Sequence, residues 1–366
     1  MQWGDLITLE YGKPIKDKES ANGPIPVYGT NGQIGTSHLK PLCEHPSFIL
    51  GRKGAYRGVH YSDTPFSVID TAFYAKPISD KVDLKWAYYK FLTYDINRMD
   101  SGSAIPSTDR YEIYSIDVDL PDLVTQRRVV SVLELLDNKI QDNNKINDNL
   151  EQQTQAIFKS WFVNFEPFNG IMPYNWAVCT LGDITEMGAG GDKPKESSPV
   201  KTLSHPYPIY SNGINNHGLY GYTNEPKIKD ESVTVSARGT IGYVCLRHHP
   251  YVPIVRLVTL IPDVNVVSAK YLYLYLCQLH IAGTGTTQQQ LTVPDFRKTE
   301  IVVPDKTIMS AFTEAVTPIF EQIWVNEDEN IKLAEIRDSL LPKLMSGELG
   351  QACAHCPIFP TAASRR

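Results

Sequence analysis

The sequence contains 366 residues, enough for two or three domains, and carries a formal net charge of −6. Its 42% hydrophobic and 21% charged residues describe an ordinary globular protein. No run of about 18 apolar residues occurs, which excludes a membrane-spanning helix, and the N-terminus lacks the basic and apolar regions of a secretory signal. We therefore expect a cytoplasmic protein.

The charge is spread along the chain. Residues 1–122 hold 13 Lys and Arg against 16 Asp and Glu, and residues 167–304 hold 11 against 10. No region is strongly basic, which argues against a non-specific polyanion binder. A binder whose basic residues face one side remains open.

The first 120 residues alternate short β-rich runs with turn signals, followed by an aromatic-rich amphipathic helix over residues 84–93. Asn31-Gly32 marks a hairpin-like turn, and residues 102–110 form a polar loop before a last strand-like run at 118–120. The other predicted strands are 25–28, 47–50, 66–69 and 71–75.

The loop over residues 51–58 places two Arg, one Lys and one Tyr between three glycines. Glycine lets a backbone approach a ligand closely, and Arg and Lys suit phosphate oxygens or guanine O6 and N7. This pattern predicts nucleic-acid contact. The alternative is a hairpin whose charges are merely solvated.

Residues 123–166 form the first long helical pattern, which runs without proline or glycine as far as residue 162. Its seam residues recur in alternating steps of three and four, the rhythm of a helix that pairs with another helix. A buried Asn lowers stability but fixes register and partner, so we interpret this seam as a specified pairing. The alternative is a surface helix on a globular body. The seam consists of Leu133, Leu136, Ile140, Asn143, Asn147, Leu150, Thr154, Ile157 and Trp161.

A second helical pattern follows over residues 305–349. Each pattern begins after a Pro-Asp pair, at Pro121 and at Pro304, and each has two Asn near its middle. Pro318 lies inside the second pattern and predicts a kink or a separate first segment. The second seam consists of Phe312, Val316, Ile319, Ile323, Asn326, Asn330, Leu333, Arg337, Leu340 and Leu344.

The segments that precede the two helical patterns, here called heads, repeat as well. For example, residues 51–54 match 236–239, and residues 85–92 match 270–276. The chain is therefore a tandem duplication of an α+β head followed by a long helix. The predicted domains are head 1 (1–122), spacer helix 1 (123–166), head 2 (167–304), spacer helix 2 (305–349) and a disordered tail (350–366).

Loops of the second head also carry polar groups suited to nucleic acid. Gln288, Gln289 and Gln290 offer amides, which pair bidentately with adenine, although a flexible polar loop is the alternative. Asn31 and Asn212 have the same chemistry, but Asn-Gly is first of all a turn signal.

Catalytic and metal-binding patterns are lacking. The sequence has no HExxH or GxSxG motif, no cofactor-binding glycine fingerprint and no carboxylate-lysine cluster of a nuclease. Cys353 and Cys356 have CxxC spacing, but one such pair is at most half a zinc site, and we interpret it as part of an incidental tail. The sequence predicts a non-catalytic protein without a metal of its own.

Across residues 1–349 the plan resembles the specificity (S) subunit of type I restriction–modification systems. The strongest marks are residues 155–167 (Gln-Ala-Ile-Phe-Lys-Ser-Trp-Phe-Val-Asn-Phe-Glu-Pro) and 337–349 (Arg-Asp-Ser-Leu-Leu-Pro-Lys-Leu-Met-Ser-Gly-Glu-Leu). Pro121-Asp122 followed by Gln126-Arg127 fits too. The second helix departs there, because Pro304-Asp305 is followed by Lys-Thr-Ile-Met.

The resemblance implies that each head is a target recognition domain for one half of a bipartite site in double-stranded DNA, and that the helices form an antiparallel coiled coil that spaces the heads. It also implies two methyltransferase (modification) subunits docked on the helices, joined by restriction subunits that translocate DNA. S-adenosylmethionine, ATP and magnesium then belong to those partners, with no cofactor in this chain and no membrane contact.

Two rival hypotheses stay open. One is a coiled-coil scaffold that never touches DNA. The other is a fragment of a fused type II restriction–methylation enzyme, which would need an Asn/Asp-Pro-Pro-aromatic motif and a glycine-rich cofactor loop that the sequence lacks.

Because the family's heads vary in sequence, base-contact residues cannot be transferred by motif and are predicted from loop chemistry. The predicted DNA-binding residues of the first head are Arg52, Lys53, Tyr56, Arg57, Ser103 and Arg110. Those of the second head are Ser236, Arg238, Gln288, Gln289 and Gln290. The predicted partner-docking residues, for which intramolecular packing is the alternative, are Phe158, Trp161, Phe162, Leu340, Leu341 and Leu344.

Overall fold

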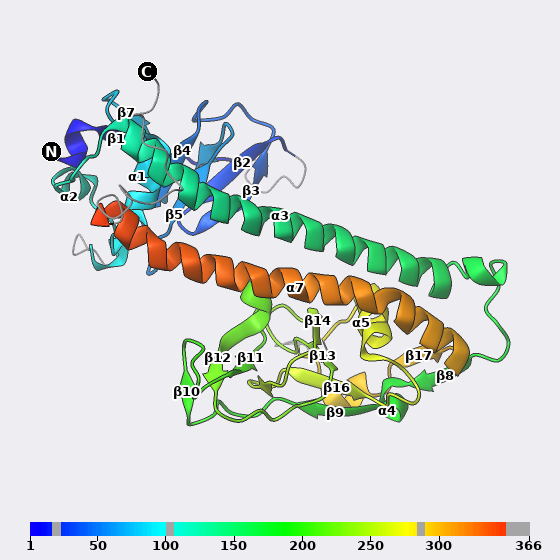
Figure 1. Cartoon of the computed structure of the whole chain (residues 1–366). Coiled ribbons are helices and arrows are strands. Elements are labelled where there is room, and N and C mark those ends of the chain that lie inside the picture. The colour runs from blue at the N-terminus through cyan, green and yellow to red at the C-terminus, as the bar shows by residue number, and fades with distance from the viewer. Residues whose placement is uncertain (17–22, 100–105, 284–289, 349–366) are drawn as a thin grey trace, which may run out of the picture. The chain divides into compact units, whose positions relative to one another are not determined.

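The computed structural model describes residues 1–16, 23–99, 106–283 and 290–348. The chain divides into two compact units, unit 1 (Met1–Asp142 with Asp328–Arg366) and unit 2 (Asn143–Glu327). Each unit holds a globular head together with part of both long helices, α3 (Leu123–Phe162) and α7 (Lys306–Met345) (Figure 1).

The head of unit 1 contains two small sheets. An antiparallel sheet has the order β1-β7-β4-β5 and is covered by α1 (Leu84–Phe91). Its strands are β1 (Ile7–Tyr11), β7 (Ala72–Pro77), β4 (Ser47–Gly51) and β5 (Val59–Ser62). A mixed sheet has the order β3-β2-β6, with strands β2 (Ile25–Gly29), β3 (Gly32–Ser37) and β6 (Ser67–Val68). The short helices are η1 (Trp3–Asp5), η2 (Ile96–Arg98) and α2 (Arg110–Tyr114).

The head of unit 2 repeats this topology. Its antiparallel sheet, in the order β9-β16-β13-β14, is covered by α5 (Ala269–Gln278). The strands are β9 (Thr185–Ala189), β16 (Val258–Pro262), β13 (Ser232–Val235) and β14 (Val244–Arg247). The mixed sheet joins β12 (Leu219–Thr223), β11 (Tyr207–Tyr210) and β15 (Val252–Pro253), with β10 (Ser197–Ser198) added at its edge. The remaining elements are β8 (Ala177–Thr180), β17 (Glu300–Val303), α4 (Leu181–Ile184), α6 (Val293–Phe296), η3 (Glu166–Phe168) and η4 (Asn215–Gly218).

The duplication extends to single backbone hydrogen bonds. The Thr108 N–H donates to the Arg52 carbonyl at 2.8 Å, and the Leu291 N–H donates to the Ala237 carbonyl at 3.0 Å. In both heads the second sheet has one parallel pair, β2·β6 in one and β11·β15 in the other. The predicted α+β fold with two pseudo-repeated heads is confirmed.

The two Pro-Asp pairs start the long helices. The carboxylate of Asp122 accepts the Thr125 N–H at 2.7 Å, and that of Asp305 accepts the Thr307 N–H at 3.0 Å, so both aspartates satisfy N–H groups that a helix start leaves unpaired.

The departure of the second helix from the family motif also has a structural explanation. The buried Gln126 amide bonds the Asp83 N–H and the carbonyls of Lys81 and Pro121. Met309 occupies the equivalent position and packs into an apolar core, where no such bonds are needed.

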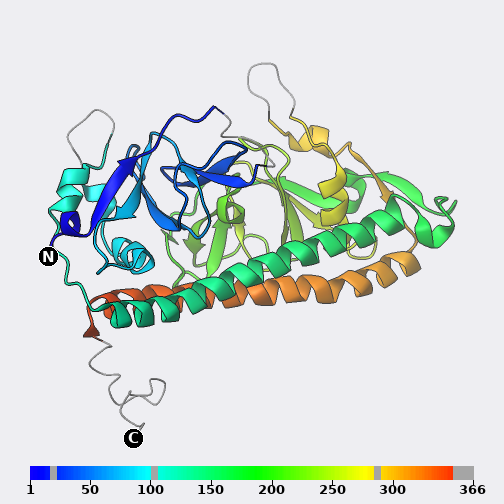
Figure 2. The same ribbon diagram turned by 90° about the horizontal axis from the view of Figure 1, so that it is seen from above.

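Within each unit the two helices pair antiparallel, and both views show them side by side (Figures 1 and 2). In unit 1, Arg337 binds Asp137 at 2.8 Å and Lys139 binds Glu329 at 3.3 Å. In unit 2, the Asn326 amide donates to the Asn147 side-chain oxygen at 2.7 Å. Every residue of both predicted seams is buried or half-buried, which agrees with the coiled coil expected from their spacing.

Each core combines a head with both helices. The core of unit 1 packs Trp3, Trp86 and Phe91 against Leu133 of α3 and Leu341 of α7. The core of unit 2 gathers the strand residues of its head around one buried apolar residue of α3 and five of α7: Phe158, Met309, Phe312, Val316, Phe320 and Ile323.

One local prediction is right in part and two are wrong. Helix α7 runs through Pro318 without a separate first segment, but it bends near its start (Figure 1), in agreement with the predicted kink. Residues 118–120 form no strand; instead Asp117 makes a single bridge to Gln2. Arg110 begins helix α2, which Asp109 caps, and does not lie in a polar loop.

The buried asparagine pair gives a prediction. Asn147→Ala removes the acceptor for Asn326 and the 3.3 Å bond to the Ile323 carbonyl, leaving a buried amide unsatisfied. We expect a loss of about 1–3 kcal/mol in the free energy of unfolding, measured by urea denaturation. Replacing both residues by Leu should restore stability but relax helix register, seen as mixed oligomers in light scattering. Equal stability of wild type and Asn147→Ala would contradict this account.

A stacked His–Trp pair connects the head of unit 2 to its own segment of α7. The His248 ring lies 4.1 Å from that of Trp324 with 14° between the planes, and Lys270 lies 5.3 Å from the same ring while bonding Glu231 at 2.9 Å. Burial, together with the charges of His249, Lys270 and Arg247, lowers the pKa of His248 to about 3. The imidazole is therefore neutral in the folded protein.

This depressed pKa predicts a pH effect on stability. Below pH 6.5 the unfolded chain binds a proton at His248, whereas the folded chain does not. The free energy of unfolding therefore decreases as the pH is lowered from about 6.5 to about 3. Allowing for the partly exposed ring, we expect His248→Phe to remove about 1 kcal/mol of the stability difference between pH 7 and pH 5. Denaturation at both pH values measures this, with the exposed His45→Gln as control. An unchanged difference in His248→Phe would refute it.

Candidate nucleic-acid interface

In the first head, the glycine-rich loop after β4 is held by backbone and hydroxyl bonds. The Thr30 hydroxyl donates to the carbonyls of Lys53 and Thr71 at 2.8 and 3.0 Å, and Gly54 has a φ of +128°, which favours glycine. The side chains of Lys53 and Tyr56 project into solvent, with Tyr56 68% exposed. Both are therefore accessible to a ligand, as their prediction requires.

Arg57 does not share this exposure. It is 2% exposed, and one Nη donates to the Asn97 carbonyl at 2.9 Å while the Asn97 amide oxygen accepts the Arg57 N–H at 2.7 Å. Its predicted role as a DNA contact is corrected, because the side chain lies inside the head and supports the loop. The pattern of glycines and cations could not reveal which cation faces inward.

Arg52 and Arg110 converge on Tyr11 at the end of β1. Their guanidinium carbons lie 4.7 and 5.0 Å from the Tyr11 ring centroid, and Tyr11 itself is 44% exposed. Arg52 also donates to the Asp70 carbonyl at 2.9 Å, and Arg110 donates to the Tyr111 hydroxyl at 3.1 Å. The structure thus brings two predicted residues together around a third that sequence reasoning missed.

In the second head, Arg238 is exposed and donates to the Gln290 side-chain oxygen at 3.1 Å. Ser236 is 1% exposed and donates to the Asn212 carbonyl, so its predicted DNA contact is corrected: burial withdraws it from any ligand. Ser103, Gln288 and Gln289 lie outside the described residues.

Asn212 connects neighbouring segments of the second head through its side chain. Its side-chain oxygen accepts the Ala237 N–H at 2.7 Å, and its amide donates to the Val255 carbonyl at 2.6 Å. Val255 and Arg256 have φ values of +53° and +64°, a strained conformation for residues other than glycine. The amide that could have paired with adenine is therefore used within the head, where it connects three segments of the chain.

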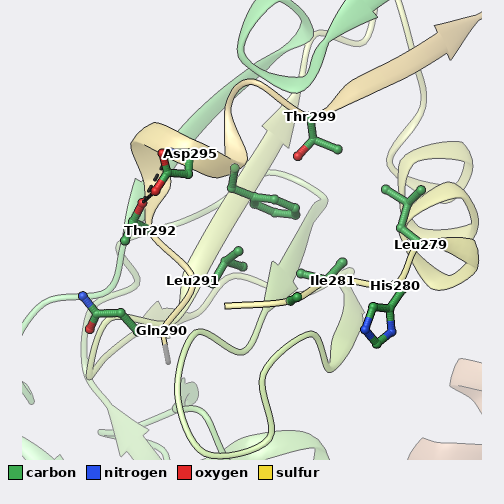
Figure 3. A pocket seen from close by; sticks show the side chains of 10 residues that line it. Leu279, His280, Ile281, Gln290, Leu291, Thr292, Asp295 and Thr299 are labelled. Carbon is green, nitrogen blue, oxygen red and sulfur yellow. Dashed lines mark hydrogen bonds between the residues drawn. The ribbon is translucent and has the colours of Figure 1, made fainter. Parts of the chain in front are cut away.

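A hollow of about 290 Å³ lies beside Gln290 in unit 2 (Figure 3). Leu291, Ile281 and Phe296 line it, and the Thr292 hydroxyl donates to the Asp295 carboxylate at 2.7 Å across its edge. Figure 3 shows the Gln290 amide directed away from the apolar lining.

The predicted docking residues are largely used inside the chain. Phe158 is 1% exposed and Leu341 7% exposed, both within the cores, so free docking surface is ruled out for these two. Trp161 and Phe162 are half-buried and contact the Phe312 ring at 5.8 and 4.8 Å between centroids. Leu340 and Leu344 are half-buried.

No group of three or more His, Cys, Asp or Glu side chains suited to a metal ion occurs among the described residues. In that same part of the chain, neither long helix nor any other is apolar enough to cross a bilayer. Cys353, Cys356 and the predicted disordered tail fall outside the described ranges.

Comparison with known proteins agrees with this architecture. The family described as "Type I restriction modification DNA specificity domain" matches residues 1–152 and 173–333, so the chain belongs to this family. It is a specificity subunit: a non-catalytic protein that determines DNA recognition in a type I restriction–modification system. The scaffold and fused-enzyme alternatives have no support.

Individual relatives cover most of the chain. The MjaIX specificity subunit of Methanocaldococcus jannaschii is 25% identical over 304 residues, covering 74% of this chain and 70% of that protein. The putative specificity subunit S.MpnORF507P of Mycoplasma pneumoniae is 25% identical and covers 91% of this chain and 92% of its own. The crystal structure of an S subunit from M. genitalium shares the fold, with a TM-score of 0.59, 16% identity and coverage of 94% and 95%.

The two side-chain hydrogen bonds of Asn212 generate a prediction. Asn212→Ala removes both side-chain bonds, whereas Asn212→Asp keeps the acceptor for Ala237 and loses only the donor to Val255. We expect a loss of about 1–3 kcal/mol in the free energy of unfolding for Ala. The loss should be smaller for Asp. Urea denaturation measures both, and an Asp variant less stable than the Ala variant would contradict the stabilising role of these two bonds.

Proposed function

We propose that each head recognises one half of a bipartite site in double-stranded DNA. The observation that carries this proposal is the duplication itself: the same backbone scaffold occurs twice, with different side chains at its ligand-facing loops. Lys53 and Tyr56 are exposed in the first head, and Arg238 with Gln290 in the second. Two related but different recognition surfaces suit a site whose halves differ.

The predicted contacts are those of known DNA-binding chemistry. Arg and Lys bind phosphate oxygens and guanine, and an amide such as that of Gln290 pairs with adenine. The overall charge of −6 does not oppose this, because the cations are placed locally on the heads.

The paired helices set the gap between the two half-sites, in this proposal, and dock two modification subunits. Support comes from the polar seam, in which Asn147 and Asn326 bond each other and so fix register. Exposed apolar residues on the outer faces of the helices support docking, because a bound protein would remove their apolar surface from water. In unit 1 they are Val124, Leu135, Ile331 and Ile336, exposed by 47–71%.

Restriction subunits that translocate DNA join this core in the proposed complex. S-adenosylmethionine, ATP and magnesium are bound by the partners, and this chain supplies recognition, spacing and docking. The basis is family membership together with the lack of catalytic motifs in the sequence.

Mapping of methylated bases in cells that carry the complete system tests the proposed recognition. We expect two short modified half-sites separated by an unspecified gap. Footprinting of the assembled complex should then protect two patches around an unprotected spacer. Methylation at a single continuous site would contradict the proposal.

The length of the helices gives a second test. Inserting seven residues into each helix, next to the junction of the two units at residues 142 and 327, keeps the heptad pattern in phase. We expect the gap between half-sites to lengthen while both half-sites stay the same. An unchanged gap would show that the helices do not set it.

Docking is tested by charge on the outer helix face. Leu135→Glu and Ile336→Glu place a carboxylate on side chains that are 71% and 47% exposed. We expect at least about tenfold weaker binding of the modification subunit, as when about 1.4 kcal/mol is lost. Gln141→Glu, on an exposed position of α3, is the control for added charge. Wild-type affinity of both variants in a titration of purified subunits would refute this docking face.

A further inference from the structure

We propose that Tyr11, Arg52 and Arg110 form a site for a DNA phosphate, present in the first head and lacking in the second. This inference rests on the proposed function, because it takes the ligand of the heads to be a duplex. It adds what the site binds, which residue organises it, and how the two heads differ.

The two guanidinium groups are held in place before any ligand arrives. Arg52 follows β4 and Arg110 begins α2, yet both lie within 5.0 Å of the centroid of one ring, that of Tyr11 on β1. Each has a second restraint, Arg52 at the Asp70 carbonyl and Arg110 at the Tyr111 hydroxyl. A binder that is already ordered loses less entropy on association.

Within the described ranges, no carboxylate compensates the two positive charges of this cluster. Among the described residues, neither Arg52 nor Arg110 forms an ion pair with a carboxylate, and the Arg110 Nε is buried without a hydrogen-bond partner. Two like charges beside one ring repel each other, whereas each cation–π contact contributes only about 0.5–1 kcal/mol at an exposed site. An anion that accepts bonds from both groups would remove the repulsion.

A phosphate suits this geometry better than a guanine. Recognition of guanine uses two N–H groups on one edge of a single, extended guanidinium. Here each arginine already gives an Nη to the head itself. Phosphate oxygens point in several directions and can accept charge-assisted bonds from both side chains at once.

The second head provides an internal comparison. The paired bonds of Thr108 with Arg52 and of Leu291 with Ala237 make Ala237 the counterpart of Arg52. By the same alignment of strands and helix starts, Ala189 ends β9 where Tyr11 ends β1, and Val293 begins α6 where Arg110 begins α2.

All three members of the cluster are therefore replaced by small or apolar residues. The neighbouring cation is retained, as Lys53 in one head and Arg238 in the other. The scaffold thus carries the phosphate site in one head only. DNA binding by the first head should therefore depend more strongly on salt concentration than binding by the second head.

The test uses the complex of the full chain with its modification subunits and a duplex that contains the site it methylates. Binding constants are measured over a series of salt concentrations for Arg52→Gln and Arg110→Gln, which keep polar side chains of similar reach. We expect each to reduce the slope of log K against log salt by about 1 and to weaken binding equally on specific and unrelated DNA. Lys40→Gln, which removes a cation already paired with Glu44, is the charge control.

Tyr11 is a positioning residue, and its variants separate position from charge. Tyr11→Phe keeps the ring and should retain the wild-type slope, whereas Tyr11→Leu removes the ring without changing any charge and should reduce the slope. Thermal midpoints of all variants are compared first, so that only folded proteins are titrated.

Two results would overturn the phosphate site while leaving the proposed function intact. One is an unchanged salt slope in both arginine variants. The other is a loss of discrimination at one base pair with the slope unchanged, which would mark a base contact. A wild-type complex that shows no preference for its methylated sequence would instead reject the proposed function itself.

Discussion

Antiparallel pairing of α3 and α7 is the constraint on which both units depend. Each head leaves one apolar face that its own strands and short helices do not cover, and two helical segments from distant parts of the chain close it. Within the seam, the side chains of Asn147 and Asn326 bond each other only when the two helices lie in this register. Packing energy and register are therefore set at the same surface.

Much of the fold was predictable because it follows from periodicity and repetition. The heptad steps predicted long paired helices, and each seam position is covered in the structure. Errors arose where one residue type serves two backbone states. The helix that contains Pro318 bends but is not divided, and Asp109 caps a short helix where a polar loop was expected.

The candidate site was less predictable, since the direction of a side chain depends on contacts far along the chain. Arg52, Lys53 and Arg57 share one glycine-rich loop, yet one lies on Tyr11, one faces solvent and one is buried against Asn97. Tyr11 gave no signal at all, because a tyrosine ending a strand is common. Comparison of the two heads could have drawn attention to it, since Ala189 replaces it in an otherwise equivalent strand.

The completion of the first core by Leu341 and Met345 affects how the protein is made. Unit 2 is one continuous stretch of chain, whereas unit 1 is discontinuous and needs residues that the ribosome adds after those of unit 2. Nascent domains generally fold in the order of synthesis, but here the amino-terminal half must wait, with part of its apolar face uncovered. Termination before α7 would thus leave the cores of both units incomplete, because residues of this helix contribute to each of them.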